Sequence, residues 1–183
     1  MYFQKSEVKG KTALVTGAGK GIGKASAIAL AEAGADLIIL SRTKSDLEKV
    51  KKEIIKLKRK CIIYDCDVSN FEELRSVFNQ ISKLDIIVNN AGTNRPEHYT
   101  KIYIEDMDYI VDLNLKAAFH VAQMGAKVMT KQKNRKSIGG SIINVSSQLG
   151  KVGAPKRSIY NMTKFGIEGL TRGMALDLAK NNI

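Results

Sequence analysis

The chain has 183 residues, of which 44% are hydrophobic and 26% are charged, and its formal net charge is +12. A chain of this length buries about 70% of the surface that its unfolded form exposes, which argues against intrinsic disorder. No apolar run approaches the roughly 20 residues of a membrane span, and the first residues lack the apolar segment of a secretory signal. We therefore expect a cytoplasmic protein without a membrane partner.

Short, continuous apolar runs alternate with longer helical patterns along the whole chain. Continuous rather than alternating apolar runs are typical of strands that are covered by helices on both faces. This alternation predicts an α/β fold, a doubly wound parallel sheet of Rossmann type with strand order 3-2-1-4-5 and a ligand crevice at its carboxyl edge. No repeat or linker divides the chain, so we expect a single domain over residues 1–183. The predicted strands are residues 12–16, 36–40, 61–64, 84–89 and 141–145, and the predicted helices are residues 21–33, 45–58, 71–81, 105–129 and 159–180.

The first predicted strand runs into a glycine-rich turn, TGAGKGIG at residues 16–23, and then directly into a helix. Gly17 can form a tight turn, while Gly21 and Gly23 let backbone N–H groups and the helix N-terminus approach a pyrophosphate. The spacing is GxxxGxG rather than the GxGxxG of the common dinucleotide fingerprint. Taken alone, the turn leaves open whether it binds a dinucleotide or is a flexible connection.

Two further motifs follow in order: NNAG at residues 89–92, and YNMTK at residues 160–164, which Ser147 precedes. With the glycine-rich turn they make the chain resemble the short-chain dehydrogenase/reductase family, whose pattern is TGxxxGxG, NNAG, Asn, Ser and YxxxK. The resemblance covers the chain from Lys9 to Ile183. It implies an NAD(P)-dependent oxidoreductase acting on CH–OH groups, most similar to 3-oxoacyl-(acyl-carrier-protein) reductases and to sugar and polyol dehydrogenases.

The resemblance implies that Asn114, Ser147, Tyr160 and Lys164 are the catalytic residues. Tyr160 and Lys164 stand four residues apart on a predicted helix, so their side chains share one face. A phenol ionises only near pH 10; a nearby cation favours its anion, and a shift of three pH units requires about 4 kcal/mol. By resemblance Tyr160 is the general acid in reduction and the base in the reverse reaction, and Ser147 rather than Ser146 positions the substrate oxygen. By the same resemblance, Asn114 is expected to break the helical hydrogen-bond ladder locally and to hold a water that links Lys164 to solvent.

The same resemblance implies a nicotinamide dinucleotide cofactor, and the end of the second predicted strand indicates which one. NAD-selective members have an acidic residue there, whereas this chain has Ser41 followed by Arg42. Because Arg42 and Lys20 attract a 2′-phosphate, we expect NADPH/NADP+ to be preferred over NADH/NAD+. Asp67 and Val68 are expected at the adenine, with Asp65 as the alternative. The expected cofactor-binding residues are Thr16, Gly17, Lys20, Gly21, Ile22, Gly23, Ser41, Arg42, Asp67, Val68, Asn90, Ala91, Gly92, Tyr160 and Lys164.

The resemblance implies that the substrate is a small carbonyl or alcohol, and the sequence leaves its class open. The basic segment 131–136 suits an acidic acyl carrier protein that bears a 3-oxoacyl thioester. The polar loop after NNAG, with Arg95, His98 and Tyr99, suits a sugar, a sugar acid or a polyol unless it only faces solvent. A non-catalytic nucleotide-binding module is the alternative of another class. By resemblance we expect a homo-oligomer, either a dimer or a tetramer.

The remaining features predict no further ligand. The lysines of residues 49–60 surround an apolar stripe at helical spacing, so they are expected to form a solvated helix face rather than a nucleic-acid site. Cys61 and Cys66 are predicted to be buried thiols rather than a redox or zinc pair. The two histidines, His98 and His120, have no metal-ligand spacing, so no metal site is predicted.

Family members usually continue past the position of Ile183 with a sixth strand, a loop against the nicotinamide, a substrate lid and a seventh strand. The resemblance therefore implies that these 183 residues lack the usual last strands and the lid. On that basis we expect the domain to be truncated at its C-terminus. We also expect the isolated chain to bind cofactor weakly and to turn over slowly or not at all.

Overall fold

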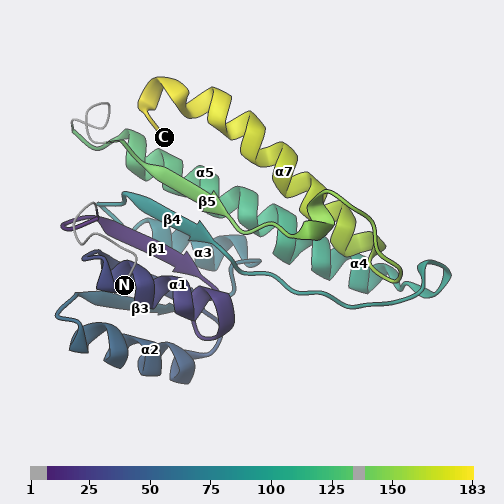
Figure 1. Cartoon of the computed structure of the whole chain (residues 1–183), viewed down its shortest axis with the longest axis horizontal. Helices are drawn as coiled ribbons and strands as arrows, with labels where there is room; N and C mark the ends of the chain where they lie inside the picture. The colour runs from purple at the N-terminus through teal and green to yellow at the C-terminus, as the bar shows by residue number, and fades with distance from the viewer. Residues whose placement is uncertain (1–7, 134–138) are drawn as a thin grey trace.

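The computed structural model describes residues 8–133 and 139–183. Within these residues the strands form one parallel sheet in the order β3-β2-β1-β4-β5, which confirms the predicted fold class (Figure 1). The strands are Thr12–Thr16 (β1), Asp36–Ser41 (β2), Cys61–Asp65 (β3), Ile86–Asn89 (β4) and Ser141–Asn144 (β5). The α-helices are Gly21–Glu32 (α1), Lys44–Lys56 (α2), Phe71–Phe78 (α3), Ile104–Val111 (α4), Ala117–Thr130 (α5) and Ser158–Leu178 (α7). None of the helices in the described ranges is long and apolar enough to cross a membrane.

Helices cover both faces of the sheet, so each face has its own apolar core. Figure 1 shows α1 and α2 on one side of the strands and α5 and α7 on the other. Successive side chains of β1 point to opposite faces: Ala13 and Val15 pack with α1 and α2, whereas Leu14 packs with α3 and α5. Burial on both faces explains why the strands are continuous apolar runs.

The predicted helix over residues 105–129 differs from the structure, because it is two α-helices joined by a π-helical turn, Asp112–Lys116. The amide N–H of Ala117 donates to the carbonyl of Asp112, five residues earlier, instead of following the usual four-residue pattern. Leu113 and Asn114 within this turn are both buried. The π-helical turn therefore places the polar side chain of Asn114 in the interior, next to α7.

The carboxyl ends of β1 and β4 are tied together by hydrogen bonds from one threonine. The Thr16 hydroxyl accepts from the backbone N–H groups of Asn90 and Ala91, each at 3.0 Å. The Asn90 side chain in turn donates to the Thr16 carbonyl at 3.0 Å. Because the strands are parallel, these bonds hold the glycine-rich turn and the NNAG segment side by side at one edge of the sheet.

Candidate active site

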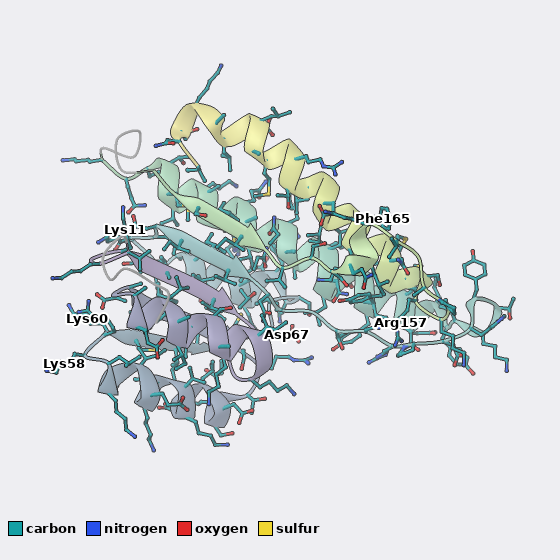
Figure 2. The ribbon with its side chains drawn as sticks, in the orientation of Figure 1. Lys11, Lys58, Lys60, Asp67, Arg157 and Phe165 are labelled. Atoms are coloured by element: carbon teal, nitrogen blue, oxygen red, sulfur yellow. The ribbon has the colours of Figure 1, made fainter. Side chains whose placement is uncertain are left out.

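A cleft of about 610 Å³ opens at this carboxyl edge. In Figure 2, Asp67 marks the carboxyl edge of the sheet, and Lys11 marks the opposite, amino edge. Most of the predicted cofactor-binding residues line the cleft, whereas Thr16 and Gly23 are not among its lining. The lining consists of Gly17, Gly19, Lys20, Gly21, Ile22, Ser41, Arg42, Thr43, Asp46, Cys66, Asp67, Val68, Asn90, Ala91, Gly92, Thr93, Asn94, Leu113, Val145, Ser146, Tyr160 and Lys164.

The glycine-rich turn needs glycine at defined positions. Gly17 and Gly21 have φ values of +63° and +56°, in the left-handed region that side chains disfavour. A Cβ at Gly23 would lie 2.3 Å from the Gly17 carbonyl oxygen and 2.6 Å from the Asn90 amide nitrogen, so the start of α1 packs directly on the turn. No Cβ contact would arise at Gly21, which faces open space.

The N-terminus of α1 is also suited to an anion. Lys20, its N-cap residue, makes no side-chain cap hydrogen bond, and the first turn of the helix contains no acidic residue. The first N–H groups and the positive end of the helix dipole are therefore available to a phosphate at this end of the cleft. The turn and the helix together fit the pyrophosphate of a dinucleotide.

Tyr160 and Lys164 both line the cleft from the first turns of α7. Lys164 is only 6% exposed, and its ammonium donates a 2.7 Å hydrogen bond to the carbonyl of Val145. It lies 5.6 Å from the centroid of the Tyr160 ring. Burial lowers the pKa of Lys164, because removal from water disfavours the charged form. The predicted pair is thus brought together, with a desolvated cation close to the phenol.

Asn114 is buried behind the cleft, where its amide pairs with a backbone unit. Its Nδ2 donates to the Thr93 carbonyl at 2.8 Å, and its Oδ1 accepts from the Thr93 N–H at 2.8 Å. A longer bond of 3.3 Å joins Nδ2 to the Thr163 hydroxyl on α7. Asn114 therefore fixes the segment after NNAG relative to α7. Its predicted role in holding a water stays a prediction.

The two adjacent serines differ in position. Ser147 is the N-cap of a short 3-10 turn, Gln148–Gly150, and its hydroxyl accepts from the N–H of Leu149 at 3.1 Å. Ser146 rather than Ser147 is among the cleft-lining residues, and its buried hydroxyl has no hydrogen-bond partner within the described part of the chain. The structure thus places Ser147 beside the cleft, and its predicted role at the substrate oxygen stays a prediction.

At the other end of the cleft, Arg42 follows β2 and contacts two side chains. Its Nη1 donates to the Tyr109 hydroxyl at 3.1 Å and lies 3.7 Å from a carboxylate oxygen of Asp67. The hydrogen bond to Tyr109, and then the nearby charge of Asp67, raise the pKa of Arg42 above its ordinary value. Asp67 and Val68 line the cleft here, whereas Asp65 is exposed at the end of β3 and is not part of the lining.

Sequence reasoning missed several cleft residues. Leu113 carried a signal, since it directly precedes Asn114, and Cys66 likewise directly precedes Asp67. Thr93 also carried a signal, since it directly follows NNAG. Tyr109, which contacts the lining residue Arg42 from outside the lining, carried none, because only its long-range hydrogen bond reveals it. The additional lining residues are Gly19, Thr43, Asp46, Cys66, Thr93, Asn94, Leu113, Val145 and Ser146.

Both cysteines are buried, as predicted, and burial raises the pKa of Cys61 to about 12 and that of Cys66 to about 11. Over residues 8–133 and 139–183, no group of three or more histidine, cysteine or acidic side chains could hold a metal ion. In the loop after NNAG, His98 and Tyr99 are exposed. Residues 134–136 of the basic segment predicted to suit a carrier protein lie outside the described residues.

The chain is similar to known proteins in three respects: it matches a family model, it is related in sequence to a named reductase, and it resembles solved structures. A family model described as "short chain dehydrogenase" matches residues 11–183. A 3-oxoacyl-[acyl-carrier-protein] reductase FabG from Thermotoga maritima is 36% identical over 96% of this chain and 71% of its own length. An NAD+-bound xylitol dehydrogenase has a TM-score of 0.88 at 33% identity, covering 97% of this chain and 68% of its own. A gluconate 5-dehydrogenase from Burkholderia cenocepacia in complex with NADP and tartrate has a TM-score of 0.87 at 30% identity, covering 96% and 69%.

Proposed function

The chain belongs to the short-chain dehydrogenase family of oxidoreductases that act on alcohol and carbonyl groups, and on this premise we propose that it transfers a hydride between NADP(H) and a carbonyl or secondary alcohol. The favoured substrate is a 3-oxoacyl thioester. The observation that carries the proposal is the meeting of Tyr160 and Lys164 with the glycine-rich turn in one cleft.

The residues at the cleft support hydride chemistry. Backbone N–H groups of the glycine-rich turn and of the first turn of α1 would hold the pyrophosphate, and a bound nicotinamide would supply or accept the hydride. The Tyr160 hydroxyl donates a proton to the carbonyl oxygen that is being reduced. The Lys164 ammonium, 5.6 Å from the Tyr160 ring, favours the resulting phenolate. In the proposal the Ser147 hydroxyl positions the substrate oxygen, and Asn114 secures the segment at Thr93.

The preference for NADP(H) rests on two cations and on a missing carboxylate. Arg42 and Lys20 line the cleft, and the residue that ends β2 is Ser41, which cannot repel a 2′-phosphate as an acidic residue would. Asp67 lies 3.7 Å from Arg42 and reduces the local positive charge without cancelling it, because Lys20 adds a second cation. We therefore expect the chain to bind NADPH more tightly than NADH.

Two substrate classes are supported by different observations. The 36% identity to a 3-oxoacyl carrier-protein reductase favours a 3-oxoacyl thioester, and the net charge of +12 suits an acidic carrier protein that would bear it. The likeness to a xylitol dehydrogenase and a gluconate 5-dehydrogenase favours a polyol, a sugar or a sugar acid as the second candidate.

A homo-oligomer is also proposed, because Phe119, Met162 and Phe165 expose large apolar side chains on α5 and α7 (Figure 2, Phe165).

Side-by-side titration with NADPH and NADH, followed by reduced-cofactor fluorescence, tests the cofactor; the chain has no tryptophan to interfere. Arg42→Asp should raise the KM for NADPH much more than the KM for NADH, and equal changes contradict the assignment.

Turnover is then measured with an acetoacetyl thioester and with keto-sugars. If wild type turns over and Tyr160→Phe binds cofactor without turnover, the enzyme is supported. Bound cofactor without turnover in either form favours the non-catalytic module.

A further inference from the structure

Two arginines from distant parts of the chain converge on one tyrosine at the rim of the cleft. Arg42 at the end of β2 donates a 3.1 Å hydrogen bond to the hydroxyl of Tyr109 on α4. Arg95, in the loop after NNAG, lies with its guanidinium carbon 4.3 Å from the centroid of the same ring. Each guanidinium also has an acidic neighbour, Asp67 beside Arg42 and Asp106 beside Arg95.

This arrangement borders the cleft through Arg42, whereas Tyr109 and Arg95 are not among the lining residues. Arg42 and Asp67 line the cleft, and so does Leu113, which lies one helical turn after Tyr109. Because the Tyr109 hydroxyl is bonded to Arg42, Tyr109 stands at the rim of the end of the cleft where Arg42 and Asp67 lie, which the proposed function assigns to the adenosine of the cofactor. Nothing in the hydride chemistry proposed above uses Tyr109 or Arg95.

The two arginines contact Tyr109 in different ways: Arg42 bonds to its hydroxyl, and Arg95 lies over its ring. The Tyr109 hydroxyl accepts one N–H of the Arg42 guanidinium. The positive charge and the remaining N–H donors of Arg42 therefore stay available to an anion. The Arg42 side chain is 57% exposed, and an exposed arginine without such a bond samples many rotamers. The Arg95 cation rests on the face of the ring, where the π-electrons attract it, and thereby restricts the ring.

We propose that Tyr109 is a positioning residue that holds Arg42 in place for a 2′-phosphate, and that Arg95 in turn steadies the Tyr109 ring. The inference rests on the proposed NADP(H) function and deepens it. It links recognition of the 2′-phosphate to the loop after NNAG, since Arg95 belongs to that loop. The Tyr109 hydroxyl is therefore a determinant of cofactor selectivity, although it does not itself bind the cofactor.

The test variant is Tyr109→Phe, which removes the hydroxyl but keeps the ring under Arg95. Loss of one hydrogen bond to a charged group at an exposed site should raise the Kd for NADPH about three- to tenfold. The Kd for NADH should change less than about twofold, because its ribose has no phosphate for Arg42 to meet. The matched control is Tyr103→Phe, whose side chain is 72% exposed, and it should change neither Kd.

Three results of the Tyr109→Phe titrations with NADPH and NADH would overturn the inference. An equal rise in both Kd values indicates a general structural role, an unchanged NADPH Kd shows that Arg42 needs no positioning, and tighter NADPH binding shows that the hydroxyl competes with the phosphate. Arg95→Gln should raise the NADPH Kd in the same direction by a smaller factor, and no change there removes Arg95 from the proposal.

A reference variant separates this inference from the proposed function. If Arg42→Gln weakens NADPH selectively while Tyr109→Phe does not, the positioning role alone fails. If Arg42→Gln leaves the NADPH Kd unchanged, the NADP(H) preference fails and the positioning role fails with it. The same comparison by calorimetry with adenosine 2′,5′-bisphosphate and 5′-AMP, which differ by the 2′-phosphate, requires only the adenosine end of the cleft. Equal effects of Tyr109→Phe on these two ligands likewise overturn the inference.

Discussion

The ammonium group of Lys164 donates a 2.7 Å hydrogen bond to the carbonyl oxygen of Val145, which joins α7 to the chain just after β5. Among the described residues Lys164 has no carboxylate partner within ion-pair distance, so its charge is balanced only by this carbonyl dipole. The same bond directs the cation toward the cleft that Tyr160 lines. Burying a lysine without an acidic partner lowers the stability of the fold. In the proposed chemistry, the same charge beside Tyr160 favours the phenolate.

This arrangement makes stability depend on pH in a defined direction. The pKa of Lys164 is lowered by burial from an ordinary 10.5, so the unfolded chain binds this proton more tightly than the folded chain. The penalty is fully present below the lowered pKa and is relieved as pH rises toward 10.5. We expect the free energy of unfolding of wild type, relative to Lys164→Met, to rise between pH 7 and about pH 10. Urea denaturation at both pH values measures it, and a relative stability that falls with pH contradicts the expectation.

The glycine-rich turn predicts a second result. Alanine at Gly23 would place its Cβ 2.3 Å from the Gly17 carbonyl oxygen, so the turn and the start of α1 must separate. We expect Gly23→Ala to lower the free energy of unfolding by about 1–3 kcal/mol, as overpacking does. The displaced turn should also weaken NADPH and NADH together, since both share the pyrophosphate. Chemical denaturation and cofactor titration report the two effects.

Gly169 on α7 is the matched control for that substitution. A Cβ there meets nothing within 4 Å, and the residue is exposed on the helix. Gly169→Ala should therefore raise the free energy of unfolding by about 0.5–1 kcal/mol through helix propensity. If Gly23→Ala behaved like Gly169→Ala, the close packing of α1 on the turn would be wrong.

The buried amide of Asn114 predicts a third result. Asn114→Ala leaves the N–H and the C=O of Thr93 without their 2.8 Å partners. A fully buried unsatisfied group costs about 1–3 kcal/mol; because Thr93 is only half-buried, water can reach these groups in part, and we expect a loss of about 2 kcal/mol in the free energy of unfolding for the two together. Gln123→Ala, an exposed polar residue of α5, should change it by less than about 0.5 kcal/mol. Equal effects of the two variants would show that the pairing with Thr93 does not contribute.

The sequence predicted the sheet well because each strand is a local apolar run, and the runs are short enough to be read individually. The helical pattern continues across Asp112–Lys116, so local spacing did not show the break; only the resemblance indicated that Asn114 could interrupt the helix, and its bonds with Thr93, 21 residues earlier, give the physical reason. Tyr109 was missed because its partner Arg42 is 67 residues away. Short-range patterns thus predicted the positions of the elements and the motifs, while the side chains that support the motifs depended on tertiary contacts.

The two thiols provide the last prediction. Burial raises the pKa of Cys61 to about 12 and that of Cys66 to about 11, from an ordinary 9.0. A rise of two pKa units lowers the thiolate fraction at pH 8 about a hundredfold, and the thiolate is the reactive form. We therefore expect both thiols to react with an aromatic disulfide reagent at least about a hundred times more slowly in the native chain than in denaturant.

Cys66 makes this a sensitive measurement, because it lines the cleft and yet is only 3% exposed. An added exposed thiol, Ser82→Cys, should react at the rate of a free cysteine and shows that the reagent is effective. Rapid native labelling that Cys66→Ala abolishes would mean that the cleft admits the reagent to this thiol. Slow labelling of both cysteines, accelerated together on unfolding, is the result that a buried thiol on each side of the sheet requires, since Cys61 and Cys66 belong to different cores.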